Sequence, residues 1–399
     1  MIKVKLSEIC DLQNGYAFKS SDYVENSNTL SCRMSNIRLG GIFDIEYNPR
    51  FLPDSFADQY KGFLLKDGDL VIAMTDLAND PKLLGVPTLV QTDGRNILLN
   101  QRVGKLIIKD SSKVDNKYLQ HVLNDPKTRE YYRKFASGGL QINLGKTDLL
   151  NVEIPLPPLE EQRRIASILD QADGLRQKRQ QAIEKLDQLL QATFIDMFGD
   201  PVSNPKGWNL GRLGDVIHSA KDGPHVSPSY SETGIPFLST RHVRAGKIVW
   251  GDLKFITEED AQIHWKKCKP TRGDILYTKG GTTGLAAVVD TDLDFAVWVH
   301  VALLKTNHDK VRSEWLVSML NTQYCYEQSQ RYTHGIANRD LGLKRMVNIE
   351  MYIPPLDEQD KFVNFKNKLL KNNLLFESSY SSLEQLFKSL QNQAFNGTL

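Results

Sequence analysis

Two glycine-rich runs carry the side chains whose types and spacing could bind a polyanion. In residues 279–284 (KGGTTG), glycine would let the backbone approach phosphate groups, while the lysine and two threonine hydroxyls could contact them. The other run is residues 137–139 (SGG), whose Gly138 recurs as Gly335. Both runs also have the composition of tight turns between strands, and for either run alone this second interpretation is favoured.

The sequence lacks the motifs of several enzyme classes. It has no G-x-x-x-x-G-K-[ST] phosphate loop, no G-x-G-x-x-G motif and no H-E-x-x-H among its 8 histidines, so ATP hydrolysis, a Rossmann site and a metal centre lack support. An adenine methyltransferase should resemble its family in an Asn/Asp-Pro-Pro-aromatic tetrad. Residues 79–82 and 124–127 (NDPK in both) have lysine at the aromatic position. The hypothesis that this chain itself methylates or cleaves DNA is therefore not favoured by its sequence.

Composition places the chain among ordinary soluble proteins. Its 399 residues, 40% hydrophobic and 25% charged, predict about two to three domains. No run approaches the roughly 18 apolar residues of a membrane span, and the first residues lack the apolar core of a signal peptide. The 4 cysteines have no C-x-x-C spacing. We expect a cytoplasmic protein with no membrane partner, and the net charge of +2 is too small to identify a partner.

The elements that must position these side chains occur twice. Residues 151–162 (NVEIPLPPLEEQ) recur as residues 348–359 (NIEMYIPPLDEQ), 197 residues later. Residues 35–42 and 66–72 recur near the same offset as 241–248 and 271–277. Each copy consists of short apolar runs, such as 70–74, 285–289 and 295–304, between clusters of Gly, Pro, Asn and Asp. This texture predicts strands and loops with a few helices.

After each Pro-Pro step the pattern becomes helical. Apolar residues then recur at spacings of three and four over about four heptads, which is typical of coiled coils. The predicted seam of the first helix is Ile165, Ile168, Ala172, Leu175, Ala182, Leu186 and Leu189. That of the second helix is Phe362, Phe365, Leu369, Phe376, Leu383, Leu386 and Leu390. A less favoured interpretation is two unrelated amphipathic helices, each packed on its own globule.

The patterns together predict an α/β (α+β) chain with an internal pseudo-two-fold duplication. Two globules are separated by two long antiparallel coiled-coil helices, each rising about 50 Å. The predicted segments are 1–155 for the first globule, 156–200 for the first spacer helix and linker, 201–353 for the second globule and 354–399 for the second spacer helix.

These residues resemble the specificity (S) subunits of type I restriction-modification enzymes over nearly the whole chain. The most specific part is residues 154–170 (IPLPPLEEQRRIASILD), with a second copy at 353–359 (IPPLDEQ). Residues 14–22 (NGYAFKSSD) and 273–284 (GDILYTKGGTTG) look like parts of that family's target recognition domains. The resemblance implies that each globule reads one half of a bipartite DNA site. It also implies that the chain's two ends lie near each other.

The resemblance further implies that the partners are double-stranded DNA, two methyltransferase (M) subunits docked on the helices, and a restriction (R) subunit. This chain would be non-catalytic and hold no cofactor, while the M subunit would use S-adenosylmethionine and the R subunit ATP and magnesium. Because the globules differ in nearly every loop, the two half-sites should differ, and helix length should set the gap between them. The alternative is a coiled-coil protein-interaction adapter without direct DNA readout.

Candidate contacts to bases or phosphates are polar and basic loop residues, since Arg suits guanine edges and Asn or Gln suits adenine. In the first globule they are Lys19, Arg33, Asn36, Arg38, Gln141, Asn143 and Lys146. In the second they are His225, Arg241, His242, Arg244, Lys279, Thr282, His334, Asn338 and Arg339. Each of them could instead be a solvated charge or a turn residue. Tyr16 and Phe18 could pack on a sugar or a distorted base, but a core position is favoured.

Overall fold

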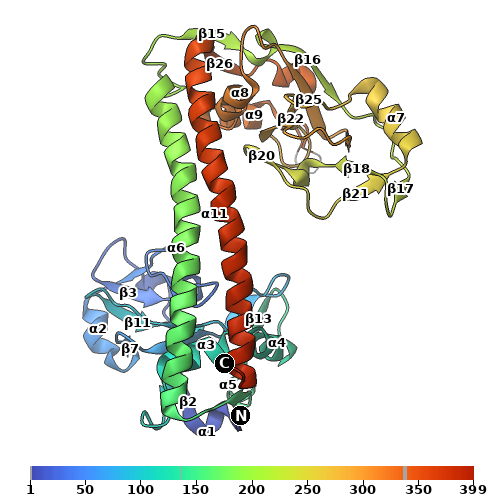
Figure 1. The fold of residues 1–399 in the computed structure, drawn as a ribbon. Coiled ribbons are helices and arrows are strands. Elements are labelled where there is room, and N and C mark those ends of the chain that lie inside the picture. Colours follow the sequence, from blue (N-terminus) through green and yellow to red (C-terminus); the bar gives the residue numbers. More distant parts are fainter. Residues whose placement is uncertain (1, 136, 336–338) are drawn as a thin grey trace. The chain divides into compact units, whose positions relative to one another are not determined.

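The computed structural model describes residues 2–135, 137–335 and 339–399, which form two compact units. The first unit is Met1–Gln180 with Ser378–Leu399, and the second unit is Gln181–Glu377. Each unit holds one globule, the start of the long helix that follows it and the end of the other long helix (Figure 1).

The first half of the chain is built from short strands and helices followed by one long helix. Its strands are β1 (Lys3–Lys5), β2 (Cys10–Asn14), β3 (Thr29–Cys32), β4 (Ile37–Arg38), β5 (Ile42–Phe43), β6 (Phe51–Leu52), β7 (Leu64–Leu65), β8 (Leu70–Ala73), β9 (Thr75–Leu77), β10 (Pro87–Leu89), β11 (Asn96–Leu99), β12 (Val103–Ile108), β13 (Gln141–Asn143) and β14 (Glu153–Pro155). Its helices are α1 (Leu6–Ile9), α2 (Ser55–Gln59), α3 (Asn116–Leu123), α4 (Pro126–Phe135), α5 (Lys146–Leu150) and α6 (Leu159–Phe198), with 3-10 turns η1 (Ser20–Asp22), η2 (Met34–Asn36) and η3 (Lys61–Phe63).

The second half of the chain follows a similar order. Its strands are β15 (Asn209–Arg212), β16 (Ile217–Asp222), β17 (Tyr230–Ser231), β18 (Ile235–Leu238), β19 (Val243–Arg244), β20 (Lys247–Ile248), β21 (Lys254–Ile256), β22 (Ile275–Thr278), β23 (Ala286–Val288), β24 (Ala296–Val297), β25 (Val301–Thr306) and β26 (Glu350–Ile353). Its helices are α7 (Glu258–Lys267), α8 (Ser313–Leu320), α9 (Gln323–Tyr332), α10 (Leu343–Met346) and α11 (Leu356–Asn396), with 3-10 turns η4 (Leu213–Asp215) and η5 (Thr240–His242).

Each unit contains two four-stranded sheets. One pair of sheets has the same strand order in both units, and the other pair shares a stretch of three strands, β6-β3-β11 and β21-β18-β24. The sheet β10-β8-β12-β2 is antiparallel throughout, and its counterpart is β23-β22-β25-β16. The sheet β6-β3-β11-β7 pairs β3 and β11 in parallel, as β18 and β24 pair in its counterpart β17-β21-β18-β24. Central strands such as β8 and β22 are buried on both faces, which explains their unbroken apolar sequences.

Strand register and backbone hydrogen bonds identify equivalent residues in the two units, which we call twins. Gly104 pairs with Asn14 and Ile72 as Ala302 pairs with Asp222 and Tyr277. Around these strands, matching backbone hydrogen bonds extend the equivalence to the loops. The twins include Asn14 and Asp222, Asn36 and His242, Arg38 and Arg244, Met74 and Lys279, Arg102 and His300, Asn143 and Asp340, Gln162 and Gln359, and Leu169 and Lys366.

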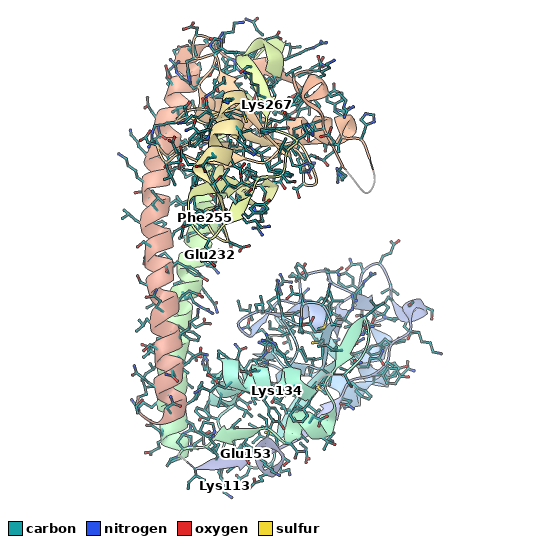
Figure 2. All side chains as sticks on the ribbon, turned by 90° about the vertical axis from the view of Figure 1, so that its right-hand side faces the viewer. Lys113, Lys134, Glu153, Glu232, Phe255 and Lys267 are labelled. Carbon is teal, nitrogen blue, oxygen red and sulfur yellow. The ribbon has the colours of Figure 1, made fainter. Side chains whose placement is uncertain are left out.

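The repeated Pro-Pro-Leu-x-Glu-Gln motif joins each globule to its helix. The side chain of Gln162 is fully buried, accepts the backbone N–H of Asp115 at 3.0 Å and donates to the carbonyls of Lys113 and Pro157 at 2.8 Å each. Lys113 is labelled in Figure 2. Gln359 makes the same three hydrogen bonds with the matching backbone groups of Arg312, Lys310 and Pro354. The glutamine therefore fixes the start of the helix to the loop before α3 or α8.

The long helices pack antiparallel within each unit, and their paired ribbons are visible in Figure 1. In the first unit Arg176 Nη1 lies 2.9 Å from Glu384 Oε1, and Arg164 donates to the carbonyl of Leu399 at 2.8 Å. In the second unit the rings of Phe194 and Phe362 lie 5.3 Å apart.

The seam prediction is wrong for three residues. Leu175, Leu189 and Leu386 are 56%, 47% and 49% exposed. Leu169 and Phe387 are buried, although the predicted seam does not include them. Arg176 also contacts the other helix, although it is not part of the predicted seam. Its guanidinium is ion-paired and lies over the Phe387 ring at 4.9 Å, so its stem covers apolar surface.

The predicted mixed fold with a repeated globule and two long antiparallel helices is confirmed. The helices α6 and α11 lie within the predicted segments 156–200 and 354–399, while the four domain boundaries stay a prediction. The apolar run 295–304 is divided between β24 and β25. Residues from both ends of the chain belong to the first unit, as the resemblance implied. Within the described ranges, no helix is long and apolar enough to cross a bilayer.

Candidate nucleic-acid interface

Asn36 and His242 hold equivalent turns in the two units. Asn36 Oδ1 accepts the N–H of Arg33 at 2.8 Å, and His242 Nδ1 accepts the N–H of Ser239 at 2.9 Å. The Asn36 amide also donates to the carbonyls of residues 44, 45 and 47. Both side chains are buried, and burial lowers the pKa of His242 below its usual value. The polar atoms of both side chains therefore have protein partners, and these hydrogen bonds hold the two turns.

The arginines of the same turns have different surroundings. Arg38 lies with its Cζ 3.7 Å from the centre of the Tyr47 ring, whereas its exposed twin Arg244 contacts only the carbonyl of Val243, at 3.5 Å, among the described residues. Arg241 is ion-paired with Asp252 at 2.8 Å. In Arg33, Nη1 is buried and has no hydrogen-bond partner within the described ranges.

Three predicted residues of the first unit come together at a cavity of about 430 Å³. Gln141 and Asn143 reach it from β13, and Lys146 from the start of α5. The ammonium group of Lys146 donates to the carbonyl of Leu12 at 2.8 Å, which holds it at this place. The other lining residues are Asn14, Met74, Thr75, Gln101, Arg102, Leu144 and Gly145.

The polar groups of this cavity have few protein partners. The exposed side chains of Asn14, Gln101 and Arg102 make no hydrogen bond or ion pair within the part of the chain that the structure describes. Sequence reasoning missed Gln101 and Arg102, because they lie between two apolar strands and belong to no repeated motif. Asn14 lies in the segment that resembles a recognition domain, but it is not among the predicted DNA contacts.

The equivalent place in the second unit holds an ion-pair network. Lys279, the twin of Met74, is buried, and its Nζ lies 3.2 Å from Asp222 Oδ2 and 3.1 Å from Asp340 Oδ1. Lys267, labelled in Figure 2 at the end of α7, pairs with the other Asp222 oxygen at 2.5 Å. The predicted contact Lys279 therefore has protein partners for its charge.

The network also sets the protonation of its buried acid. Burial by itself would raise the pKa of the Asp222 carboxyl, but the ammonium groups of Lys267 and Lys279 outweigh burial, and the pKa lies below its usual value. Asp222 is therefore ionised at neutral pH, and its charge is balanced inside the unit.

The glycine run after Lys279 forms a turn, as favoured from the sequence. Gly281 and Gly284 have φ angles of +66° and +95°, which favour glycine. At Gly280 a Cβ atom would lie 1.9 Å from Nδ1 of His300, so the ring occupies the space of a side chain.

The other predicted residues lie in exposed loops. They are Lys19, His225, Thr282, His334 and Arg339. The backbone of His334 bridges to that of Asp340, and the N–H of Gly281 donates to the carbonyl of Arg339 at 3.0 Å, so these two loops adjoin. Asn338 lies outside the described residues. The structure does not test DNA contact by any of the sixteen candidates, which stays a prediction.

Tyr16 and Phe18 occupy the favoured core position. Phe18 is 8% exposed, and its ring centre lies 5.0 Å from that of Tyr16. Both rings contact Tyr60, within a cluster that includes buried Leu52 and Leu98.

Comparison with known proteins gives matches over both units. A family model described as the type I restriction modification DNA specificity domain matches residues 1–185 and again residues 205–385. The MjaVIII specificity subunit of Methanocaldococcus jannaschii is 35% identical over 189 residues, which cover 46% of this chain and 42% of that protein. The EcoBI specificity subunit of Escherichia coli is 21% identical over 428 residues, covering 100% of this chain and 86% of that one.

Two solved structures have the same fold. The S subunit of a type I restriction-modification system from M. genitalium has a TM-score of 0.60 at 15% identity, covering 99% of this chain and 96% of that one. A chain from a study of complex assembly and conformational transition in a type I R-M system has a TM-score of 0.50 at 19% identity, covering 100% and 98%. At these identities the likeness concerns the fold alone.

Proposed function

The chain belongs to the type I restriction modification DNA specificity family, and we propose that it is the DNA-recognition subunit of such a complex. Each globule reads one half of an asymmetric bipartite site. The observation that carries the proposal is the strand order that β10-β8-β12-β2 shares with β23-β22-β25-β16, with different side chains at twin positions. A repeated scaffold presents two comparable readers, and different side chains give them different targets.

The partners are double-stranded DNA, two M subunits and an R subunit, in a cytoplasmic complex. The chain itself is non-catalytic and carries no cofactor, while the M subunit uses S-adenosylmethionine and the R subunit uses ATP and magnesium. The long helices support M-subunit docking because they expose apolar side chains that a partner could cover. Leu175, Leu374 and Leu375 are 56%, 67% and 68% exposed.

The test is to purify the full chain with the methyltransferase subunits of its host and to map the methylated adenines. We expect methylation at one bipartite, asymmetric sequence. Replacing residues 201–353 with those of another family member should change one half of that sequence and leave the other half unchanged. Methylation at no bipartite site would contradict the proposal and favour the adapter alternative.

A second experiment tests whether the helices determine the distance between the two half-sites. Inserting seven residues into both helices adds about 10.5 Å, which corresponds to about three base pairs. We expect the tolerated gap to lengthen or methylation to be lost. An unchanged gap would show that the helices do not determine the spacing.

A further inference from the structure

The cavity of the first unit is lined by a cationic set of side chains. Arg102 and Lys146 contribute positive charge, and none of the ten lining residues is acidic. Four carboxamides complete the polar lining, at Asn14, Gln101, Gln141 and Asn143. Carboxamide N–H groups and a guanidinium can all donate to an anion, and the Arg102 guanidinium has no hydrogen bond or ion pair within the described ranges.

The second unit shows what the same backbone does when acids are present. There the twins of Asn14 and Asn143 are Asp222 and Asp340, and these carboxylates engage Lys279 at 3.2 and 3.1 Å. The place is occupied by an ion-pair network, in which Arg345 also lies 3.9 Å from Asp340. In the first unit the two amides leave the cavity open and its positive charge unbalanced.

The lining also distinguishes between two parts of a nucleic acid. An extrahelical base is usually held by stacking on an aromatic ring, and none of the ten lining side chains is aromatic. Phosphate oxygens are bound by Arg and Lys together with Asn and Gln side chains, which is the set present here.

We propose that this cavity binds a phosphodiester group of the DNA backbone, with Arg102 and Lys146 as the charged contacts. The assignment rests on the proposed DNA-recognition function. It adds Asn14, Gln101 and Arg102 to the residues that hold DNA, and it assigns this contact to the first unit alone.

The test measures equilibrium binding of the full chain, assembled with its methyltransferase subunits, to the mapped site and to a scrambled duplex at several salt concentrations. Arg102→Ala should weaken binding to both duplexes by a similar factor, roughly tenfold, because it removes a charged hydrogen bond. The slope of log K against log salt should become less negative by about 0.9, the value for one phosphate contact. Asn143→Asp, which installs the residue of the second unit, should also weaken binding to both duplexes.

Two control variants isolate the site. Arg102→Lys keeps the charge and should preserve the salt slope. Lys113→Ala also removes one positive charge, but this side chain is paired with Asp110 at 3.1 Å and lies at the joint with α6, so both affinities should stay unchanged.

The outcomes separate this inference from the proposed function. If wild-type complex reads a bipartite site but Arg102→Ala binds normally, the phosphate site is wrong and the recognition function stands. If Arg102→Ala relaxes sequence preference without changing the salt slope, Arg102 contacts a base edge and the phosphate assignment is wrong. If wild-type complex reads no site, both are wrong.

Discussion

Asn14 in the first unit and Asp222 in the second stand at the same place at the ends of matching strands, and they differ only in an amide against a carboxylate. Around them the backbone hydrogen bonds of Met74 and Lys279 are the same. One unit has a cavity lined by two cations, and at the same place the other has an ion-pair network that includes two lysines and two acids. The two units thus share a scaffold, and a few side chains determine which groups each unit offers to a ligand.

The largest expected effect concerns what the units share. Gln162→Leu and Gln359→Leu should each lower the free energy of unfolding by about 3 kcal/mol, because each leaves buried backbone groups without partners. Urea unfolding of the full chain measures both. The two costs should be equal, since the hydrogen bonds are the same in both units. Gln171→Leu, at an exposed position of α6, should change stability by less than about 0.5 kcal/mol. Unequal losses of stability in Gln162→Leu and Gln359→Leu would show that the two joints are not equivalent.

The next effect concerns what the units do not share. Lys279→Met installs the first unit's residue but leaves Asp222 with one cation, at a cost of about 2–3 kcal/mol at pH 7. The folded pKa of Asp222 is lowered, so its contribution is present above the unfolded value and is lost as pH falls through the folded one. The cost should therefore shrink below about pH 4. Denaturant unfolding of wild type and Lys279→Met at pH 7 and below about pH 4 checks this. A loss of stability that does not depend on pH would contradict the prediction.

A third twin pair, Leu169 and Lys366, predicts a rise in stability at alkaline pH. Burial lowers the pKa of Lys366 to about 8, below its unfolded value, so the unfolded chain binds more protons and stability should rise from about pH 8 to 10. The rise should be about 2 kcal/mol. Lys366→Leu, which copies the first unit, should abolish the rise, whereas Lys368→Leu at an exposed site should retain it. Urea unfolding between pH 7 and 10 measures it, and a rise that survives in Lys366→Leu would exclude this amine as its source.

The smallest effect separates two twin arginines. Arg38→Ala removes a cation–π contact with Tyr47 and should cost about 0.5–1 kcal/mol. Arg244→Ala removes no such contact and should cost nothing measurable. Thermal unfolding of the two variants gives the difference, and equal costs would show that the Tyr47 ring contributes no stability.

Most of the fold could be predicted from the sequence because local patterns determine it. The Pro-Pro steps mark the helix starts within a few residues, and the repeated segments predict two copies of one topology. The seam was only partly predictable. Leu175 and Leu189 fit the apolar spacing as well as their neighbours do, and the choice depends on contacts across the helix pair.

The candidate site was less predictable for a physical reason. Gln141, Asn143 and Lys146 are predictable as polar residues within or next to a loop that recurs in both copies, but the cavity that they line also needs Asn14 and Arg102. These come from distant parts of the chain and meet only when β2, β12 and β13 are in place. The role of Lys279 was equally hidden, since a buried lysine between two aspartates has the same sequence signature as a surface lysine in a glycine turn.

The division of the long helices between the units also determines the order in which the protein can be made. The second unit is one continuous segment, whereas the core of the first unit contains Phe387 and Ala394 from the end of α11. At about 5–20 residues per second, translation reaches that segment on the order of 10–40 s after the ribosome has passed residue 180. The globule that is synthesised first therefore exposes an apolar surface until the end of α11, which completes its core, has been synthesised.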